Sequence, residues 1–395
     1  MTDVTWIDAA LTAARPQVLG ALLRYFRVLD AAEDAFQEAC LRALKTWPVK
    51  GPPRDPAAWL IFVGRNHEET IPGALAERLD ATHCRDDILR LLFVCCHPGL
   101  PATQQIALAL RIVSGLPTQE IARAFQVCER AMEQRLTRAK ARISGADVPF
   151  ESPGALVRAE RLVAVSAMVY LLFNEGYTAS GGTVHVRVPL CEEAIRLGRL
   201  LLRLFPAETE IMGLLALLLL QHARMPARLD ANNNIVLLED QDRARWDGKL
   251  IGEGLVLVEK ALRHRRAGPY QVQAAIAAVH SRAQRATDTN WGEIDRLYEA
   301  LEMLQPSPVV TLNRAVAVAR LRGAAAALEM IEPLAGKLAG YFYFFGVKGA
   351  LLTQLGRNEE ARAAFNRAIA LANTAAEAAH IRLHLDRLQK DSTPG

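Results

Sequence analysis

The sequence predicts an all-α protein built from more than one domain. Its 395 residues are more than a single core usually organises, so we expect two or three domains. Hydrophobic residues make up 51% of the chain and recur mostly at helical spacing, whereas strand-favouring runs are few. The net charge of +4 is weak evidence for nucleic-acid binding, so any such signal has to be local.

The first 66 residues predict three helices. A helical pattern covers residues 4–29 and is expected to break or restart at Pro16. Asp30 is a candidate cap for a second helix over residues 31–47, and a third helix starts at Pro56. In the second helix we expect these side chains to face inward: Phe36, Cys40, Leu41 and Leu44. We expect these to face outward: Glu33, Asp34, Gln37, Glu38 and Arg42.

Residues 104–143 predict three short helices with two sharp breaks. Ser114-Gly115 ends the first helix, and Thr118 is a candidate N-cap for a helix over residues 119–125. A third helix runs from near Cys128 to Ile143 and buries Met132, Leu136, Ala139 and Ile143. Its free face is basic. Two short helices joined by a tight turn form a helix-turn-helix pattern, and the alternative is a plain helical bundle with a solvated basic face.

Two groups of sequence motifs resemble those of a known family. Thr118-Gln119-Glu120-Ile121-Ala122, followed by Gln134-Arg135-Leu136-x-Arg138-Ala139-Lys140, resembles region four of bacterial RNA polymerase sigma factors of the extracytoplasmic-function group. Ala-Glu-Asp-Ala-Phe-Gln-Glu-Ala at residues 32–39, a Pro-rich loop and Ala58-Trp59-Leu60 resemble region two. The resemblance implies that region four reads the −35 promoter element. It also implies that the acidic helix of region two docks on the clamp helices of the polymerase β′ subunit.

These motifs predict the residues that bind DNA and those that bind the polymerase. Arg135, Arg138 and Lys140 suit phosphate contacts, because they lie beyond the first turn of the last helix. Glu129, Arg130, Glu133 and Gln134 are placed for base edges. The resemblance adds to the DNA-binding set Thr118, Gln119, Arg65 and Asn66. It assigns to polymerase binding Glu33, Asp34, Gln37, Glu38 and Arg42.

The segment over residues 63–87 departs from the family pattern. Where the family carries a basic segment for strand opening, Glu68 and Glu69 follow Arg65 and Pro72-Gly73 stops the helix. No aromatic residue occurs between Phe62 and Phe93, although unpaired bases are usually held on basic and aromatic surfaces. The sequence therefore predicts poor promoter opening, unless the C-terminal half supplies the missing surface.

From Pro149 onward the chain predicts a series of packed helices. Residues 351–371 form a tetratricopeptide-like unit that turns at Gly356 and packs through Ala361, Phe365 and Ala368, and residues 313–334 form a degenerate copy turning at Arg322-Gly323. An irregular α-bundle is the alternative for residues 150–300. Four polar segments interrupt the apolar helical pattern of the C-terminal half. We expect these segments to come together in one polar cluster, made of Asn174, Glu175, Tyr177, Asp240, Gln241, Asp242, Arg243, Trp246, Asn313 and Arg314.

These polar segments, together with Cys95-Cys96-His97-Pro98, resemble the corresponding segments of one group of extracytoplasmic-function sigma factors, and the resemblance covers nearly the whole chain. Members of that group carry a large C-terminal tetratricopeptide-like extension of the DUF6596 type, which is thought to regulate activity. Their genes commonly lie beside genes for small YCII-related proteins. The resemblance therefore implies a YCII-related protein as a possible partner of this chain. From the residues alone, the polar segments are consistent with two interpretations, a structural network of polar side chains or a groove that binds a ligand or peptide. An enzyme is disfavoured, because no nucleophile–base pair or phosphate loop is visible.

Cysteine usage and hydropathy bound the setting of the protein. The six cysteines include no CxxC pair, and His83, Cys84, Cys95, Cys96 and His97 fit no zinc spacing, so we expect neither metal nor cofactor. The start of the chain is not a signal peptide, and the longest apolar run, residues 211–220, is far short of a membrane span. These observations predict a cytoplasmic protein that does not contact the membrane.

The sequence thus predicts an alternative sigma factor with four segments. Residues 1–70 form a region-two-like domain shortened at its C-terminal end, residues 71–85 a linker, residues 86–147 a region-four-like domain and residues 148–395 a regulatory helical domain. Two other classes stay open. One is a sigma-derived interaction protein that no longer opens promoters, and the other is a helix-turn-helix regulator that senses a ligand and never contacts polymerase.

Overall fold

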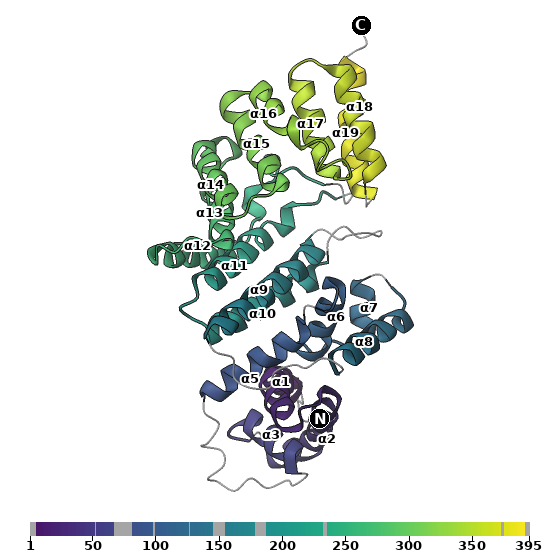
Figure 1. Cartoon of the computed structure of the whole chain (residues 1–395), viewed down its shortest axis with the longest axis vertical. Helices are drawn as coiled ribbons and strands as arrows, with labels where there is room; N and C mark the ends of the chain where they lie inside the picture. Colours follow the sequence, from purple (N-terminus) through teal and green to yellow (C-terminus); the bar gives the residue numbers. More distant parts are fainter. Residues whose placement is uncertain are drawn as a thin grey trace. The chain divides into compact units, whose positions relative to one another are not determined.

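The computed structural model describes residues 5–51, 53–66, 81–97, 99–125, 127–144, 155–177, 187–231, 235–372 and 375–391. These parts are helical, and the extended structure found in them is one isolated bridge between Leu229 and Ile235. The predicted all-α class is therefore confirmed. The chain forms two compact units, residues 1–172 and 173–395 (Figure 1), and each is described by itself.

The described part of the first unit begins with α1 (Thr5–Phe26), α2 (Leu29–Lys50), α3 (Pro56–Asn66) and α5 (Ala81–Cys95). Helix α1 continues through Pro16, so the predicted interruption there is wrong. The apolar face on the C-terminal side of Pro16, with Val18, Leu19 and Leu22 fully buried, gives a packing gain that offsets the missing backbone hydrogen bond. Helix α2 is capped by Val28 without a side-chain bond, so Asp30 is not the predicted cap.

An aromatic cluster holds these helices together. Trp47 of α2 is buried, stacks with Trp6 at 6.0 Å between ring centroids and meets Trp59 of α3 edge-on at 5.4 Å. Phe36 is buried as expected, but Leu41 and Leu44 are 54% and 50% exposed. The prediction that these two leucines face inward is wrong, because the buried stripe of α2 follows Ala35, Phe36, Ala39, Ala43 and Trp47 instead.

Three further helices form the helix-turn-helix region: α6 (Ala102–Ile112), α7 (Thr118–Ala124) and α8 (Glu129–Ser144). Gly115 has φ +74°, the left-handed conformation predicted for the break after α6. Pro117 rather than Thr118 precedes the first turn of α7, and no side chain caps it, so the Thr118 cap is wrong. Ile121 and Ala122 are buried, which joins α7 to α8.

The second unit is a succession of helices that continues from α9 (Ala155–Tyr177), which spans the division between the units. They are α10 (Val188–Leu204), α11 (Thr209–His222), η1 (Met225–Ala227), η2 (Arg243–Arg245), α12 (Gly248–Arg263), α13 (Pro269–Arg282), η3 (Ala286–Asp288), α14 (Trp291–Leu304), α15 (Pro308–Arg322), α16 (Ala324–Ile331), η4 (Glu332–Leu334), α17 (Phe342–Gln354), α18 (Asn358–Leu371) and α19 (Ala375–Asp391).

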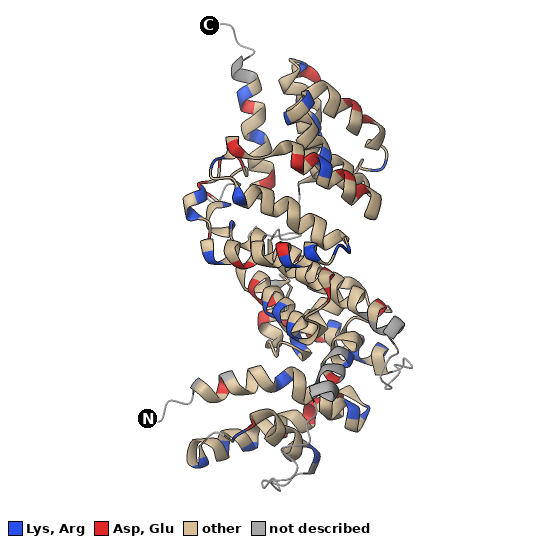
Figure 2. Cartoon of the chain, turned by 90° about the vertical axis from the view of Figure 1, so that its left-hand side faces the viewer, with Lys and Arg blue, Asp and Glu red and all other residues tan. Residues whose placement is uncertain are grey.

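The predicted turn of the last repeat lies where expected. Helices α17 and α18 are joined at Gly356, whose φ of +70° suits glycine. The packing positions Ala361, Phe365 and Ala368 are buried against α17. Helices α15 and α16 meet at Gly323 in the same manner, as the degenerate upstream copy predicts. In both units the charged residues are spread over many helices rather than gathered in one block (Figure 2).

Candidate nucleic-acid interface

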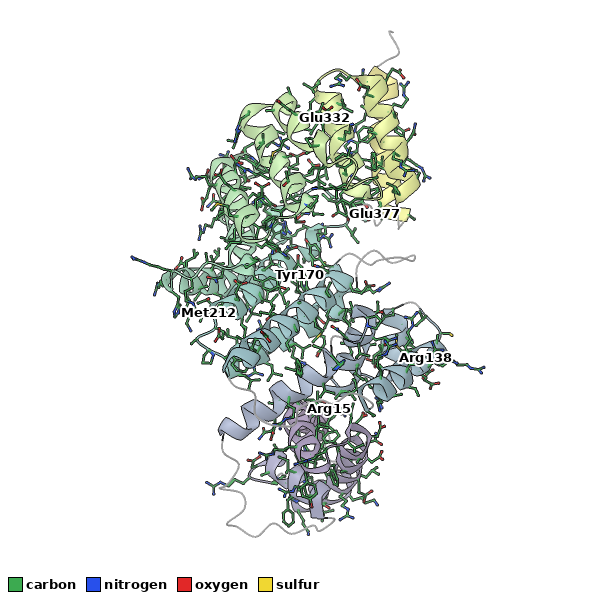
Figure 3. The ribbon with its side chains drawn as sticks, viewed as in Figure 1. Arg15, Arg138, Tyr170, Met212, Glu332 and Glu377 are labelled. Carbon is green, nitrogen blue, oxygen red and sulfur yellow. The ribbon has the colours of Figure 1, made fainter. Side chains whose placement is uncertain are left out.

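Helix α8 presents a polar face on one side and packs through the other. Met132, Leu136, Ala139 and Ile143 are buried, as the sequence predicts. The polar side chains that are exposed on α8 include Glu129, Arg130, Glu133, Gln134 and Arg138. Figure 3 shows Arg138 at the edge of the first unit, with its side chain directed away from the helices. Arg135 and Thr118 are half-buried, and Gln119 is exposed at the start of α7.

Lys140 differs from the other basic residues of α8, because it is already paired. Its Nζ donates to Glu33 Oε2 at 2.5 Å and to Asp30 Oδ1 at 3.0 Å, both on α2. Burial alone would lower the pKa of Lys140, but the hydrogen bonds and charges of Glu33 and Asp30 outweigh burial and raise it. Glu33 is only 4% exposed, so the prediction that it faces outward is wrong.

A second contact between the first helices and the helix-turn-helix region is made by Arg15. Its guanidinium donates to the carbonyl oxygens of Ile112 at 2.9 Å and Arg111 at 3.2 Å, at the end of α6. The same group lies over the ring of Phe36, 4.9 Å from its centroid, and within 3.9 Å of Glu33. A cation that satisfies the last carbonyls of a helix is favourable there, so Arg15 joins α1, α2 and α6.

The outer face of α2 carries most of the predicted polymerase residues. Asp34 and Gln37 are exposed, and Glu38 accepts from Arg42 Nε at 3.0 Å. Leu41 and Leu44 are exposed on the same face, since they follow at the spacing of successive helical turns. Apolar side chains flanked by charged ones are typical of a surface that binds another protein.

Arg65 lies over the ring of Tyr25, 4.4 Å from its centroid. Tyr25 is 51% exposed and meets Phe26 edge-on at 4.9 Å. This aromatic pair precedes the segment in which the sequence predicts no aromatic surface, because Tyr25 and Phe26 belong to α1 and not to residues 63–92. The side chain of Asn66 and most of the segment used to predict poor promoter opening, residues 67–80, lie outside the described residues.

The polar segments of the second unit do not form one cluster. Glu175 pairs with Arg187, and Tyr177 accepts from Arg224 and Arg228. Arg243 lies over the ring of Trp246 and donates to the end of α13. The two groups adjoin at Arg224, which donates to the Tyr177 hydroxyl at 2.9 Å, while the Asp247 backbone amide donates to the carbonyl of the preceding residue, Ala223, at 2.9 Å. Arg224 and Arg228 were missed, since single arginines after an apolar helix give no sequence signal.

The remaining members of the predicted cluster have other partners. Asp242 caps η2 by accepting from the Ala244 backbone amide at 3.0 Å, and Gln241 donates to the Val236 carbonyl at 3.2 Å. Asp240 and Asn313 are exposed, and Asn174 is half-buried. Arg314 binds Asp295 and Glu302 of α14 at 2.7 Å each. The expectation of a single convergent network is therefore wrong.

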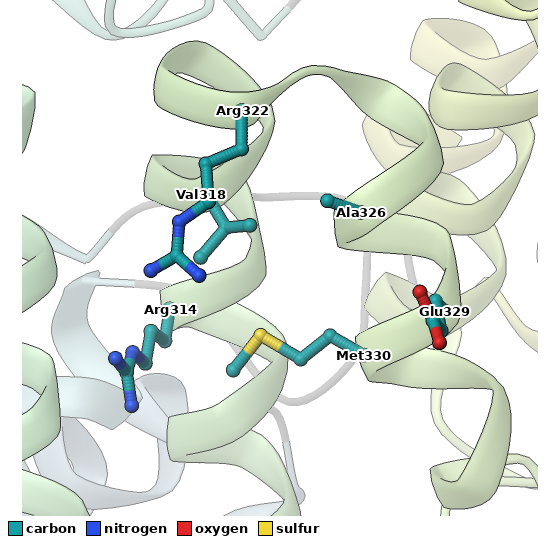
Figure 4. A pocket seen from close by; sticks show the side chains of 6 residues that line it. All are labelled: Arg314, Val318, Arg322, Ala326, Glu329 and Met330. Carbon is teal, nitrogen blue, oxygen red and sulfur yellow. The ribbon is translucent and has the colours of Figure 1, made fainter.

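Arg314 lines a pocket of about 350 Å³ between α15 and α16. Arg322 also lines it, with its guanidinium on the same side as that of Arg314, and Met330 extends toward them (Figure 4). Both arginines are neutralised by α14, because Asp295 accepts from each of them. Pairing with these two arginines also lowers the pKa of Asp295, against the opposing effect of its burial.

Cys95 and Cys96 are buried, and burial raises the pKa of both thiols, that of Cys96 to about 12. They are therefore protonated and poor metal ligands at neutral pH. Within the described ranges, no group of three His, Cys, Asp or Glu side chains is close enough to hold a metal ion. No described helix is both long and apolar enough to span a membrane.

A helix-turn-helix with an exposed polar face on its last helix, following a domain of packed helices, is the arrangement of a DNA-binding protein. Comparison with protein families gives the same answer. Residues 90–143 match "Sigma-70, region 4", residues 11–67 match "Sigma-70 region 2", and residues 161–262 match a family of unknown function, DUF6596. The chain belongs to the sigma-70 family of RNA polymerase sigma factors and carries a C-terminal extension.

This order of regions matches a sigma factor of the extracytoplasmic-function type with a C-terminal extension, and it supports an alternative sigma factor. Regions 2 and 4 imply core RNA polymerase and promoter DNA as partners, and sigma factor families are not enzymes. A curated relative, "Uncharacterized protein R00370" of Rhizobium meliloti (strain 1021), is 64% identical over 410 aligned positions. The alignment covers 98% of this chain and 97% of the relative.

Proposed function

We propose that the chain docks on core RNA polymerase through the outer face of α2 and reads the −35 promoter element with the exposed face of α8. In this proposal Asp34, Gln37, Glu38 and Arg42 meet the clamp helices of the β′ subunit. Glu129, Arg130, Glu133 and Gln134 contact base edges, and Arg135 and Arg138 contact phosphates, with Thr118 and Gln119 at the adjoining helix start. Arg65 and Asn66 are assigned to DNA nearer the start site.

The observation that carries this proposal is the exposed pair Leu41 and Leu44 on the acidic face of α2. A ligand-sensing regulator that never contacts polymerase has no use for an acidic and apolar face outside its DNA-binding part. Burying two exposed leucine side chains gives a substantial hydrophobic contribution, and the flanking charges of Asp34 and Glu38 add specificity. The leucines therefore join the proposed polymerase surface, although the sequence placed them inside.

Glu33 and Lys140 fit their proposed partners only after a rearrangement. In the structure they bind each other, so neither is available to polymerase or to DNA. Arg15 holds the same two regions together through the carbonyls at the end of α6. We therefore assign Glu33 and Lys140 to the two interfaces only in a state in which this contact is broken.

Retention by immobilised core polymerase tests the docking face. Leu41→Ala combined with Leu44→Ala should reduce retention by about tenfold or more, because two apolar anchors are lost. Val49→Ala is the matched control, since Val49 is 84% exposed on the last turn of α2. If the chain binds promoter DNA but the native protein is never retained by polymerase, it is a helix-turn-helix regulator and not a working sigma factor.

Run-off transcription from a selected promoter then separates a working sigma factor from an interaction protein derived from one. The native chain with core polymerase should give a defined transcript, and permanganate should detect unpaired thymines at the start site. We still expect opening to be weak, because Glu68 and Glu69 lie where the family carries basic residues. Binding to polymerase without any transcript would favour the interaction protein.

The C-terminal extension has a proposed regulatory role and a proposed partner. We infer that the tetratricopeptide-like helices of residues 148–395 control a promoter-directed unit made of the domains 1–70 and 86–147. Removing residues 150–395 should change transcription while core binding persists. A YCII-related small protein is the partner that the family resemblance suggests, in a cytoplasmic setting, and we assign no catalytic activity, metal or cofactor to the chain.

A further inference from the structure

Two arginines of the second unit, Arg224 and Arg228, bind the end of α9, and Arg243 lies on the neighbouring segment, whose Asp247 backbone amide donates to the Ala223 carbonyl at 2.9 Å. Arg224 donates to the Tyr177 hydroxyl at 2.9 Å, and Arg228 donates to the Tyr177 carbonyl. The guanidinium of Arg228 also lies over the Tyr177 ring, 3.6 Å from its centroid. Tyr177 in turn stacks on Phe173, 5.4 Å away, so the residue that receives both arginines is fixed by α9.

Arg243 is the third arginine of the group, and it binds the end of α13. Its Nη1 donates to the carbonyl oxygens of His280 and Ala283, the latter at 2.8 Å, and its guanidinium lies 4.6 Å from the centre of the Trp246 ring. Trp246 is 8% exposed, so this ring is a fixed wall. Arg228 and Arg243 thus each bind the end of a helix with one edge of the guanidinium.

Two of these arginines also carry a nitrogen atom without a hydrogen-bond partner in the described part of the chain. The Nε atoms of Arg224 and Arg243 and the Nε1 atom of Trp246 are buried donors without an acceptor among the described residues. No ion pair joins Arg224, Arg228 or Arg243 to a carboxylate in the described part of the chain. Because arginine cannot release its proton, three half-buried guanidinium groups without a carboxylate favour an anion that reaches the exposed part of these side chains.

Nearby carboxylates do not fill this role. Asp288 acts on Arg243 only at longer range, and its own carboxylate accepts from Arg285 at 2.9 and 3.0 Å. Of the side chains in this unit that the structure leaves undescribed, those of residues 178–186, 232–234, 373–374 and 389–395 contain a single acid, Asp391 near the end of the chain.

The electrostatics of the group agree with its geometry. Burial, followed by the charge of Arg224, lowers the pKa of Arg243. Burial, followed by the charges of Arg224 and Arg243, lowers the pKa of His280 to about 4. Burial is the larger cause of both shifts, and the neighbouring guanidinium charges act in the same direction. The pairs Glu175–Arg187 and Arg314–Asp295 in the same unit show that its other half-buried arginines do receive carboxylates.

We propose that Arg224, Arg228 and Arg243 form a binding site for a multiply charged oxyanion, and that the natural ligand is a small molecule carrying phosphate groups. A guanidinium offers two parallel N–H donors to one oxyanion, and a phosphate has enough oxygens to accept from more than one arginine. Tyr177 and Trp246 border the site with aromatic surface. A carboxylate-rich segment of a partner protein shares the anion chemistry, so the experiment compares the two sources.

Isothermal titration calorimetry of the full chain tests the site with sodium pyrophosphate, against sodium chloride at equal ionic strength. Pyrophosphate should bind the native chain, and Arg224→Gln or Arg243→Gln should each weaken binding by about tenfold or more, since a charge-assisted pair of hydrogen bonds is lost. Arg245→Gln is the matched control, because Arg245 is exposed on the same short helix η2, and it should bind as the native chain does.

Arg243→Lys guards against loss of folding, because it keeps the charge and removes the planar fork. It should retain the native circular dichroism spectrum and still bind pyrophosphate more weakly than the native chain. Equal binding by the native chain, Arg224→Gln and Arg243→Gln overturns the proposal, and so does an equal loss in Arg245→Gln. An octaglutamate peptide that binds these arginines when pyrophosphate does not would overturn the phosphate ligand in favour of an acidic protein segment.

Discussion

Buried charge is handled differently in the two units. In the first unit Asp87 is 2% exposed and lies between Arg90, at 3.0 Å, and Arg24, at 3.5 Å, while Glu33 is met by Lys140. In the second unit Arg224, Arg228 and Arg243 meet carbonyl oxygens, a hydroxyl and aromatic rings, but no carboxylate in the described residues.

This difference separates contacts that hold a fold from groups that await a ligand. A buried acid–base pair is complete, and removing one partner leaves an uncompensated charge. Arginines that cap helix ends and lie on rings are only partly compensated, since neither a carbonyl nor a ring supplies a full negative charge. The pair of Asp87 and Arg90 should therefore respond to the loss of a partner, and the group of Arg224, Arg228 and Arg243 to the gain of an anion.

The largest effect is expected for Asp87→Ala. This change leaves Arg90, which is 4% exposed, without its carboxylate, and it should lower the free energy of unfolding of the first unit by about 3–5 kcal/mol. Native-state hydrogen exchange of the α1 and α5 amides measures it, because tryptophan residues occur in both units and their fluorescence does not report the first unit alone. Asp34→Ala, at an exposed position of α2, should change stability by no more than about 0.5 kcal/mol. Equal losses in the two variants would show that the pairing of Asp87 is unimportant.

Acid should destabilise the second unit at His280. The folded pKa of about 4 lies below the ordinary value of 6.5, so the unfolded chain takes up the proton first. The contribution of neutral His280 is fully present above pH 6.5 and is lost as the pH falls toward 4, by roughly 3 kcal/mol. Hydrogen exchange of the α13 amides across this range measures the loss, and His280→Gln should flatten it. An unchanged pH dependence in His280→Gln would assign the acid sensitivity to another group.

Glu33→Gln should loosen the contact between α2 and α8. Lys140 then keeps only the exposed Asp30, so the free energy of unfolding should fall by about 1–3 kcal/mol. The same change frees Lys140 for phosphate, and binding of non-specific duplex DNA should tighten at low salt. Asp34→Asn removes a charge from the exposed side of the same helix and serves as the control in both assays. Weaker DNA binding by Glu33→Gln would mean that the pairing orders α8 for DNA rather than occluding it.

The smallest effects concern single phosphate contacts. Arg138→Ala should weaken binding to all DNA sequences and lower the slope of log affinity against log salt by about one, because an exposed cation is removed. Lys140→Ala should change this slope less, since Lys140 is already neutralised within the first unit. Arg130→Ala should instead alter which promoter sequence is preferred. Identical slopes for the Arg138 and Lys140 variants would show that DNA binding opens the contact with Glu33 at little cost.

Local patterns carried most of the helix predictions. The apolar spacing of Met132, Leu136, Ala139 and Ile143 fixed the buried side of α8, and Gly115 fixed the break after α6. The mistaken assignment of Leu41 and Leu44 came from a helix with more than one apolar side. In α2 a stripe of alanines, together with Phe36 and Trp47, is buried, so Leu41 and Leu44 remain for another surface.

The sequence by itself determined the helices, their turns and the helix-turn-helix region, because periodicity, glycine and proline act on neighbouring residues. The tertiary structure alone decided which charges are compensated. Lys140 and Glu33 are 107 positions apart, and Arg228 and Tyr177 are 51 apart. A helical pattern states which side of a helix is polar, but not which distant helix brings a partner to it. The availability of Lys140 for DNA and the unmatched charge of Arg224, Arg228 and Arg243 both depend on that long-range packing.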